Sequence, residues 1–268
     1  MFTSPGDIAF WIGSLPLYYY GIIMALSLTL GVLVAHSVTK KFYPQLDSEM
    51  IYDISPHIII GAILGARTYY CLLSFHYYAQ NPAEIIQLWH GGISIHGAII
   101  GGLIGGIIYA KRHKLPILKL CDIFSYGLIL GQALGRWGNF FNSEAFGRPT
   151  ENFLKLYIPI YKRPIQYLQY NYFHPTFLYE SILDVCIFLI LFFVIRKFIK
   201  NLDGVVFFSY LILYSIARTI VEQVRIDSVL NLFGIPIAQI VSAFLILISI
   251  IAIFVIRYRY ESNRRNNS

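Results

Sequence analysis

The chain has 268 residues, of which 57% are hydrophobic and only 13% are charged, whereas a soluble domain carries about 25% charged residues. This composition excludes an ordinary soluble domain and indicates an integral membrane protein. The formal net charge of +7 fits basic loops that face the cytoplasm, and no basic helix outside the apolar segments points to a nucleic-acid partner.

Seven segments are long and apolar enough to cross a bilayer as helices, which takes about 20 residues each. In chain order they are Leu17–Val38, Ile51–Leu73, Ile93–Ala110, Leu118–Gly135, Pro175–Ile195, Val205–Val224 and Ile235–Ile256. The N-terminus has no basic region before the first segment, so we expect that segment to remain rather than to be cleaved as a signal peptide. The pattern predicts an all-α polytopic membrane protein with seven transmembrane helices, in a single integral membrane domain over residues 1–268.

Basic residues set the expected orientation. They follow the first, third, fifth and seventh segments: Lys40 and Lys41; Lys111, Arg112, Lys114 and Lys119; Arg196, Lys197 and Lys200; Arg257, Arg259, Arg264 and Arg265. The positive-inside rule assigns these loops to the cytoplasm. The N-terminus is therefore expected to be extracytoplasmic and the C-terminus cytoplasmic. The longest connection, 137–174, lies between helices four and five and is predicted to form a small extracytoplasmic cap.

Unexpected polar residues gather at the outer ends of the predicted spans. They are Tyr20, Arg67, His96, Arg136, Asn139, His174, Glu180, Tyr214, Arg218, Glu222, Arg225 and Gln239. Ionisable residues inside a membrane are costly and usually functional. Arg218 and Glu222 are four residues apart and share a helix face. Either they form a satisfied ion pair, or Arg218 and other arginines face a common anion. His96 is either a packed histidine or a general base, and Glu144 is either a base or an arginine partner.

The residue types at this level suit an anionic phospholipid, because guanidinium groups bind phosphate oxygens bidentately. No HExxH, GxSxG or P-loop pattern occurs, and the three cysteines, Cys71, Cys121 and Cys186, have no ligand spacing. We therefore predict no metal and no cofactor. A transporter that merely binds an anion is the rival interpretation, although a transporter site is expected at the bilayer midplane. A structural membrane scaffold is a weaker rival.

The stretch from Gly135 to Gly147, GRWGNFFNSEAFG, resembles the signature G-R-x-G-N-F-x-N-x-E-x-x-G of the prolipoprotein diacylglyceryl transferase family. Further stretches resemble the family in the same order: Tyr20-Gly21, 91–97, 174–180, and Tyr214 to Arg225. Ala98 and Phe177 depart from residues common in the family, at positions with no assigned chemistry.

The resemblance implies a multi-pass protein of the bacterial cytoplasmic (inner) membrane, with its active site toward the outer leaflet. It implies transfer of the diacylglyceryl group of phosphatidylglycerol to the lipobox cysteine of a preprolipoprotein signal segment, which forms a thioether and releases glycerol phosphate. This is the first step of lipoprotein maturation. The implied partners are phosphatidylglycerol, the lipobox segment and the bilayer.

The reaction needs a thiolate nucleophile and donors for the departing phosphate. We expect Arg136 and Arg218 to bind that phosphate, with Arg225 as a third cation. His96 is the expected base, with Tyr20 and Glu144 as alternatives. The remaining expected assignments are Glu144 and Glu222 as partners that orient the arginines, and Asn139, Asn142, Gly147 and Tyr214 as substrate contacts.

Overall fold

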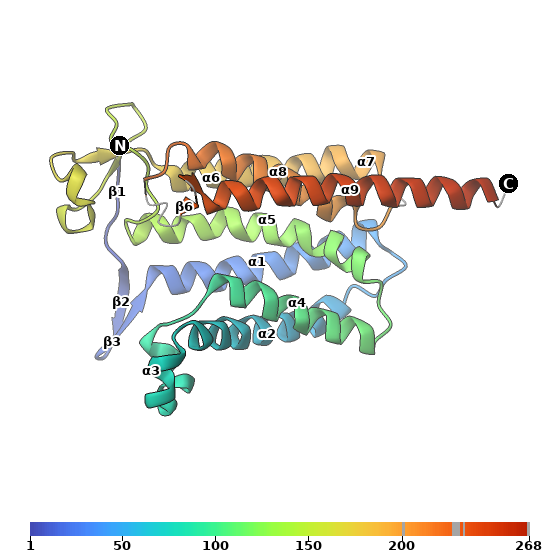
Figure 1. Ribbon diagram of the computed structural model, residues 1–268, viewed down its shortest axis with the longest axis horizontal. Coiled ribbons are helices and arrows are strands. Elements are labelled where there is room, and N and C mark those ends of the chain that lie inside the picture. The colour runs from blue at the N-terminus through green and yellow to red at the C-terminus, as the bar shows by residue number, and fades with distance from the viewer. Residues whose placement is uncertain (200–201, 227–230, 233, 267–268) are drawn as a thin grey trace. The chain divides into compact units, whose positions relative to one another are not determined.

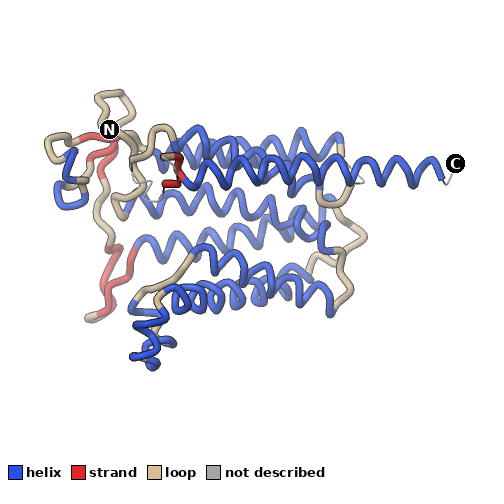
Figure 2. Tube along the Cα trace, viewed as in Figure 1, coloured by secondary structure: helices blue, strands red, loops and turns tan. Residues whose placement is uncertain are grey.

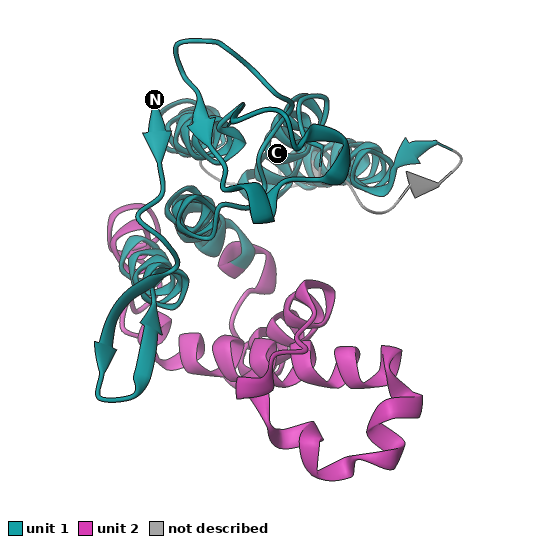
Figure 3. Ribbon diagram, turned by 90° about the vertical axis from the view of Figure 1, so that its left-hand side faces the viewer, with its two compact units in different colours: residues 1–35, 121–268 teal, residues 36–120 magenta. Residues whose placement is uncertain are grey.

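The computed structural model describes residues 1–199, 202–226, 231–232 and 234–266. Lys200, one of the basic residues expected on the cytoplasmic side, lies outside these residues. The chain divides into two compact units, one of residues 1–35 and 121–268 and the other of residues 36–120 (Figure 3). Both contain membrane-length helices, so a single membrane domain over the whole chain stays a prediction.

Helices dominate both units, and strands are confined to short segments (Figure 2). In chain order the helices are α1 (Tyr19–Phe42), α2 (Met50–Leu73), α3 (Phe75–Gln80), η1 (Pro82–Ile86), η2 (Leu88–His90), α4 (Ile95–Arg112), α5 (Ile117–Phe141), η3 (Ile160–Lys162), η4 (Ile165–Tyr167), α6 (Thr176–Leu189), the π-helical η5 (Ile190–Ile195), α7 (Arg196–Phe198), α8 (Val205–Glu222) and α9 (Ile237–Asn266) (Figure 1).

Within the described residues, six helices are long and apolar enough to cross a membrane. They are α1, α2, α5, the continuous helix Thr176–Phe198, α8 and α9. The third predicted span forms α4, but its 18 residues include His96, Lys111 and Arg112 and leave a shorter apolar stretch. The polytopic helical class is thus confirmed, whereas the seventh span and the orientation stay predictions.

Helix α5 continues six residues beyond its predicted end at Gly135. The predicted span ends there because Gly138 and Asn139, which follow, are weak helix formers. The helix instead ends after Phe141 in a Schellman motif: Ser143 adopts a φ of 49°, and the Glu144 amide donates to the Asn139 carbonyl at 3.0 Å. Arg136 and Asn139 are therefore held on a rigid helix.

The predicted cap carries a small sheet that packs on the ends of α5 and α6. β1 (Phe2–Thr3) pairs in parallel with β4 (Leu156–Tyr157), which pairs antiparallel with β5 (Tyr172–Phe173). Buried apolar side chains fill the space beneath the sheet: Phe146, Leu156, Ile158, Phe173 and Phe177. The N-terminal residues are thus tied to the segment that joins α5 to α6.

The sequence does not predict two further pairs of strands. β2 (Ile8–Ile12) and β3 (Leu15–Tyr18) form an antiparallel hairpin before α1, and β6 (Asn231–Leu232) pairs with β7 (Ile235–Pro236) before α9. Both lie at the edges of apolar runs, where hydropathy alone does not separate a strand from a helix.

Glycine contacts join helices within each unit. In residues 36–120, a Cβ at Gly97 would lie 2.3 Å from the Gly65 carbonyl oxygen of α2, so only glycine permits this approach of α4. In the other unit, a Cβ at Gly127 of α5 would lie 2.2 Å from the Gly31 carbonyl oxygen of α1. This close packing is the expected role of small residues in membrane helices.

Candidate active site: an arginine–glutamate cluster

Helix α8 presents part of the site as the sequence predicts. Tyr214, Arg218 and Glu222 are one turn apart, and Arg218 Nη2 lies 2.5 Å from Glu222 Oε2. The Glu222 side chain is 1% exposed, and a carboxylate so buried needs a charged partner. The satisfied Arg218–Glu222 pair is therefore present, and the expected role of Glu222 as a positioning partner fits it.

Glu180, on the first turns of α6, joins three arginines. Its Oε2 lies 2.6 Å from Arg136 Nε, and its Oε1 lies 3.1 Å from Arg218 Nη1 and 2.9 Å from Arg225 Nη1. We call Glu180, Glu222 and these three residues the arginine–glutamate cluster. The sequence placed Glu180 at the right level without giving it a role, because contacts between α5, α6 and α8 are invisible in one sequence.

Guanidinium groups outnumber carboxylates within the cluster, and the buried Asp184, one turn from Glu180, adds a further carboxyl near Arg136. Three guanidinium groups face the two carboxylates of Glu180 and Glu222, and Glu180 is 6% exposed. The arginine side chains remain 12–21% exposed. Since a guanidinium has five N–H donors, the contact with Glu180 occupies only part of each group. The arrangement can accept an additional anion.

Tyr214 and residues of α5 extend the arginine–glutamate cluster through hydrogen bonds. Arg136 Nη2 donates to the Tyr214 hydroxyl at 3.3 Å, and the Tyr214 ring stacks at 6.0 Å on Tyr210. Tyr210 donates in turn to Gln132 Oε1 at 3.0 Å. Arg136 is thus held at two atoms, Nε and Nη2, which fixes the plane of its guanidinium group.

In the turn after α5, the contacts of Glu144 are with side-chain amides and not with arginines. Asn139 Nδ2 donates to Glu144 Oε1 at 3.0 Å, and Asn142 Nδ2 lies 3.4 Å from the same oxygen. Glu144 is exposed. In the structure it is thus Glu180, and not Glu144 as expected, whose carboxylate orients Arg136.

Tyr20 and Gly147 join this region through close packing. A Cβ at Gly138 would lie 2.8 Å from Tyr20 Cδ2, so the missing side chain lets the Tyr20 ring lie against α5. A Cβ at Gly147 would lie 2.8 Å from Val224 Cγ1, and Gly147 forms an antiparallel bridge with Arg225. Gly147 thereby aligns the backbone that carries Arg225.

His174 lies at the border between the cap and α6. Its carbonyl accepts the Gly147 amide at 2.9 Å, and its Nδ1 lies 3.1 Å from the Tyr179 hydroxyl. Burial lowers the pKa of His174 below its usual value. The neutral ring is therefore the form that the fold favours.

His96 and Arg67 belong to the other unit, so a shared site with the cluster stays a prediction. His96 begins α4, is exposed, and lies 6.3 Å from the Tyr69 ring centroid. Arg67 has a structural role. It is 5% exposed, and its Nη1 donates to the carbonyls of Gly91 and Gly92 at 2.6 and 2.8 Å. Arg67 therefore fixes the loop that precedes His96.

The fold and the site together define a polytopic membrane protein with a cluster of arginines and glutamates at the ends of its helices. The family model described as prolipoprotein diacylglyceryl transferase matches residues 7–255. The chain therefore belongs to the prolipoprotein diacylglyceryl transferase family.

Relatives support the same assignment. A protein of Nostoc sp. (strain PCC 7120) named phosphatidylglycerol–prolipoprotein diacylglyceryl transferase is 46% identical over 249 residues, which cover 90% of this chain and 86% of that protein. A protein of the same name from Staphylococcus aureus (strain JH9) is 44% identical over 263 residues, which cover 97% and 92%. The similarity thus extends over nearly the whole length of both partners.

Proposed function

We propose that the chain transfers the diacylglyceryl group of phosphatidylglycerol to the thiol of a prolipoprotein lipobox cysteine. The observation that carries this proposal is the meeting of Arg136, Arg218 and Arg225 on Glu180. Three fixed cations at the ends of membrane-length helices suit a lipid phosphate, and the names of the relatives specify the lipid and the acceptor.

The proposed reaction is a displacement at the sn-3 carbon of the lipid glycerol. The cysteine sulfur forms a C–S bond as the C–O bond to the phosphate breaks, and glycerol phosphate leaves with the electron pair. The thiol proton passes to a base, because the thiolate is the nucleophile. Negative charge on the departing phosphate increases during this step, and preorganised donors that meet it lower the barrier.

The arginine–glutamate cluster is suited to stabilise that charge. Glu180 and Tyr214 hold the Arg136 guanidinium at two atoms, so its other N–H groups are oriented before the substrate arrives. Arg218 is held in the same way between Glu180 and Glu222. Preorganised donors of this kind cost no reorganisation as the reaction proceeds.

The remaining assignments extend the proposal. His96 is the base, with Tyr20 and Glu144 as alternatives. The amides of Asn139 and Asn142 release Glu144 and contact the glycerol headgroup in its place. The protein spans the bacterial cytoplasmic membrane seven times, counting α4. The cluster faces the outer leaflet, because the basic residues after the first, third, fifth and seventh predicted spans mark the cytoplasmic side.

A transfer assay tests the proposal. The purified protein is placed in phosphatidylglycerol vesicles with a synthetic lipobox peptide, and the peptide mass is measured. We expect a gain of one diacylglyceryl group that neutral hydroxylamine, which cleaves thioesters, does not remove, as for a thioether. Vesicles of phosphatidylethanolamine or phosphatidylcholine test the headgroup. An unmodified peptide, from folded protein that still binds the lipid, would favour a transporter that only binds the anion.

A further inference from the structure

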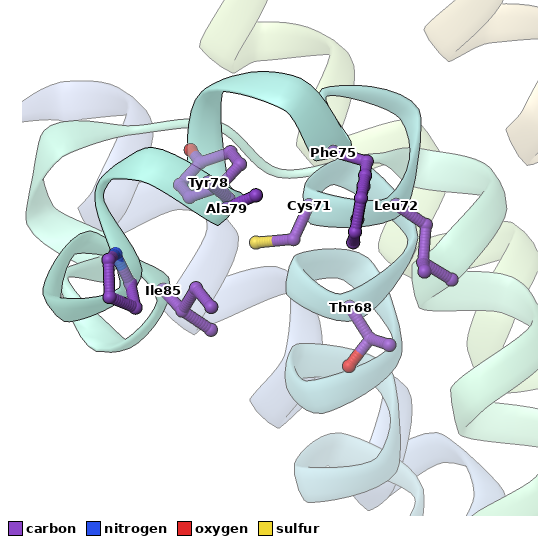
Figure 4. Close-up of a pocket in the computed structure, with 8 residues that line it drawn as sticks. Thr68, Cys71, Leu72, Phe75, Tyr78, Ala79 and Ile85 are labelled. Atoms are coloured by element: carbon purple, nitrogen blue, oxygen red, sulfur yellow. The ribbon is translucent and has the colours of Figure 1, made fainter.

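An apolar groove lies in the unit of residues 36–120, which holds no member of the arginine–glutamate cluster. Its volume is about 430 Å³, and it is lined by Thr68, Cys71, Leu72, Phe75, Tyr78, Ala79, Pro82 and Ile85. Figure 4 shows the Cys71 side chain directed from α2 toward the segment that carries Tyr78, Ala79 and Ile85. The floor of the groove is the last turns of α2, and the roof is α3 and η1.

Arg67 holds the roof in place. Its Nε donates to the Ile85 carbonyl at 2.9 Å, and its Nη2 donates to the Glu84 carbonyl at 2.5 Å. The Arg67 guanidinium also lies 5.1 Å from the Tyr78 ring centroid. Because a buried cation on α2 binds the backbone of η1, the groove is a built feature of this unit and not a gap beneath a loose loop.

The roof has a polar outer side and an apolar inner side. On the outer side, the Tyr77 hydroxyl donates to Glu84 Oε2 at 2.8 Å, and Gln80 Nε2 lies 3.3 Å from His76 Nε2. On the inner side, Tyr78 is buried at 8% exposure. This division is the one expected of a segment at a membrane–water interface.

The floor continues into a lipid-facing stripe of α2. Ile60, Leu64, Thr68 and Leu72 follow one another at four-residue spacing, and the three aliphatic residues are 56%, 62% and 65% exposed. Since α2 has the length and composition of a membrane span, hydrocarbon covers such a stripe. The groove therefore opens onto the acyl phase of the bilayer.

We propose that this groove binds one acyl chain of a membrane phospholipid. Its volume falls in the range of about 300–1,000 Å³ of small-molecule pockets, which are mostly apolar. It would hold only about one turn of a helix about 10 Å across, so a signal-peptide helix does not fit. Apart from the hydroxyls of Thr68 and Tyr78 and the weakly polar thiol of Cys71, the lining side chains offer no partner for a headgroup. The proposal does not rest on the transfer reaction.

Photocrosslinking in lipid nanodiscs tests the site. The full-length protein is reconstituted with phosphatidylglycerol that carries a diazirine on one acyl chain, and the adducts are mapped by mass spectrometry. We expect adducts concentrated on residues 68–85. Cys71→Phe fills the groove and should lower them about tenfold, which corresponds to about 1.4 kcal/mol of lost binding. Leu64→Phe, on the same stripe but outside the groove, is the matched control and should leave them unchanged.

Two outcomes would overturn the proposal. One is an even spread of adducts along Ile60, Leu64 and Leu72 that Cys71→Phe does not alter, because this is ordinary contact with surrounding lipid. The other is crosslinking of residues 68–85 by a diazirine-bearing lipobox peptide in place of the lipid. Ala79→Phe fills the groove from the exposed roof, so the test remains decisive if Cys71→Phe does not fold. The crosslinking experiment does not measure transfer activity, so its outcome is independent of the outcome of the transfer assay.

Discussion

Replacing Arg136 with lysine keeps the positive charge and removes the planar guanidinium fork. In the native protein Nε contacts Glu180 Oε2 at 2.6 Å and Nη2 contacts the Tyr214 hydroxyl at 3.3 Å. Nε and Nη2 lie at different positions on the fork, so a single Nζ cannot occupy both. The lysine ammonium would then be free to rotate, whereas the guanidinium is fixed.

The expected loss follows from the role assigned to Arg136. Removing one preorganised donor to a developing oxyanion costs about 10²–10³-fold in kcat, or about 2.7–4 kcal/mol. We expect Arg136→Lys to lose about a hundredfold or more in turnover. Binding of phosphatidylglycerol should change much less, because the cation is retained.

The assay is diacylglyceryl transfer to a lipobox peptide, run beside a phosphatidylglycerol binding measurement. Arg163→Lys is the matched control. Arg163 lies in the cap and also uses two guanidinium nitrogens, which donate to the carbonyls of Ile158 and Leu168 at 2.8 and 3.0 Å. Arg163→Lys therefore measures how much turnover is lost when a guanidinium outside the cluster is replaced. Turnover near wild type in Arg136→Lys, or an equal loss in both variants, would show that Arg136 does not bind the departing phosphate.

Three further predictions concern stability and pH. Glu180→Gln leaves three arginines without their shared carboxylate and should destabilise the protein by about 3–5 kcal/mol; an unchanged melting temperature would remove Glu180 from its central role. Gly97→Leu should prevent α4 from packing on Gly65 and reduce the folded protein recovered from membranes, whereas Gly102→Ala, whose new Cβ would be 3.5 Å from its nearest neighbour, should be tolerated. The pKa of His174 is lower in the folded protein than in the unfolded chain, so the unfolded chain binds the proton at a higher pH. The free energy of unfolding should therefore fall as the pH drops from about 6.5 toward the folded pKa. His174→Gln should flatten this part of the pH–melting curve, and an unaltered curve would contradict the assignment.

The sequence predicts most of the helices because membrane helices must be long and apolar. It also predicts that Arg136, Arg218 and Arg225 lie at the same depth in the membrane, and in the structure all three contact Glu180. Glu222 was predictable as a partner of Arg218 because four-residue spacing on a helix is a local property.

The features that sequence reasoning missed are products of tertiary packing. Glu180 meets Arg136 and Arg225 only when α5, α6 and the end of α8 come together, and no periodicity encodes that contact. The continuation of α5 past Gly135 was missed because local propensity favours a break there, whereas packing against Tyr20 favours the helix. Arg67 resembled a site residue in the sequence, and only the structure shows that it binds backbone carbonyls.

We propose that the arginine–glutamate cluster holds the lipid phosphate during diacylglyceryl transfer. The most direct test is a single-turnover reaction with phosphatidylglycerol labelled in its terminal glycerol, in which lipidated peptide and released glycerol phosphate are both counted. We predict that the wild-type protein yields the two products in equal amounts, and that Arg136→Lys, with its lipid still bound, yields almost none of either. Equal yields from the two proteins, or no product from folded wild-type protein with bound lipid, would contradict the claim.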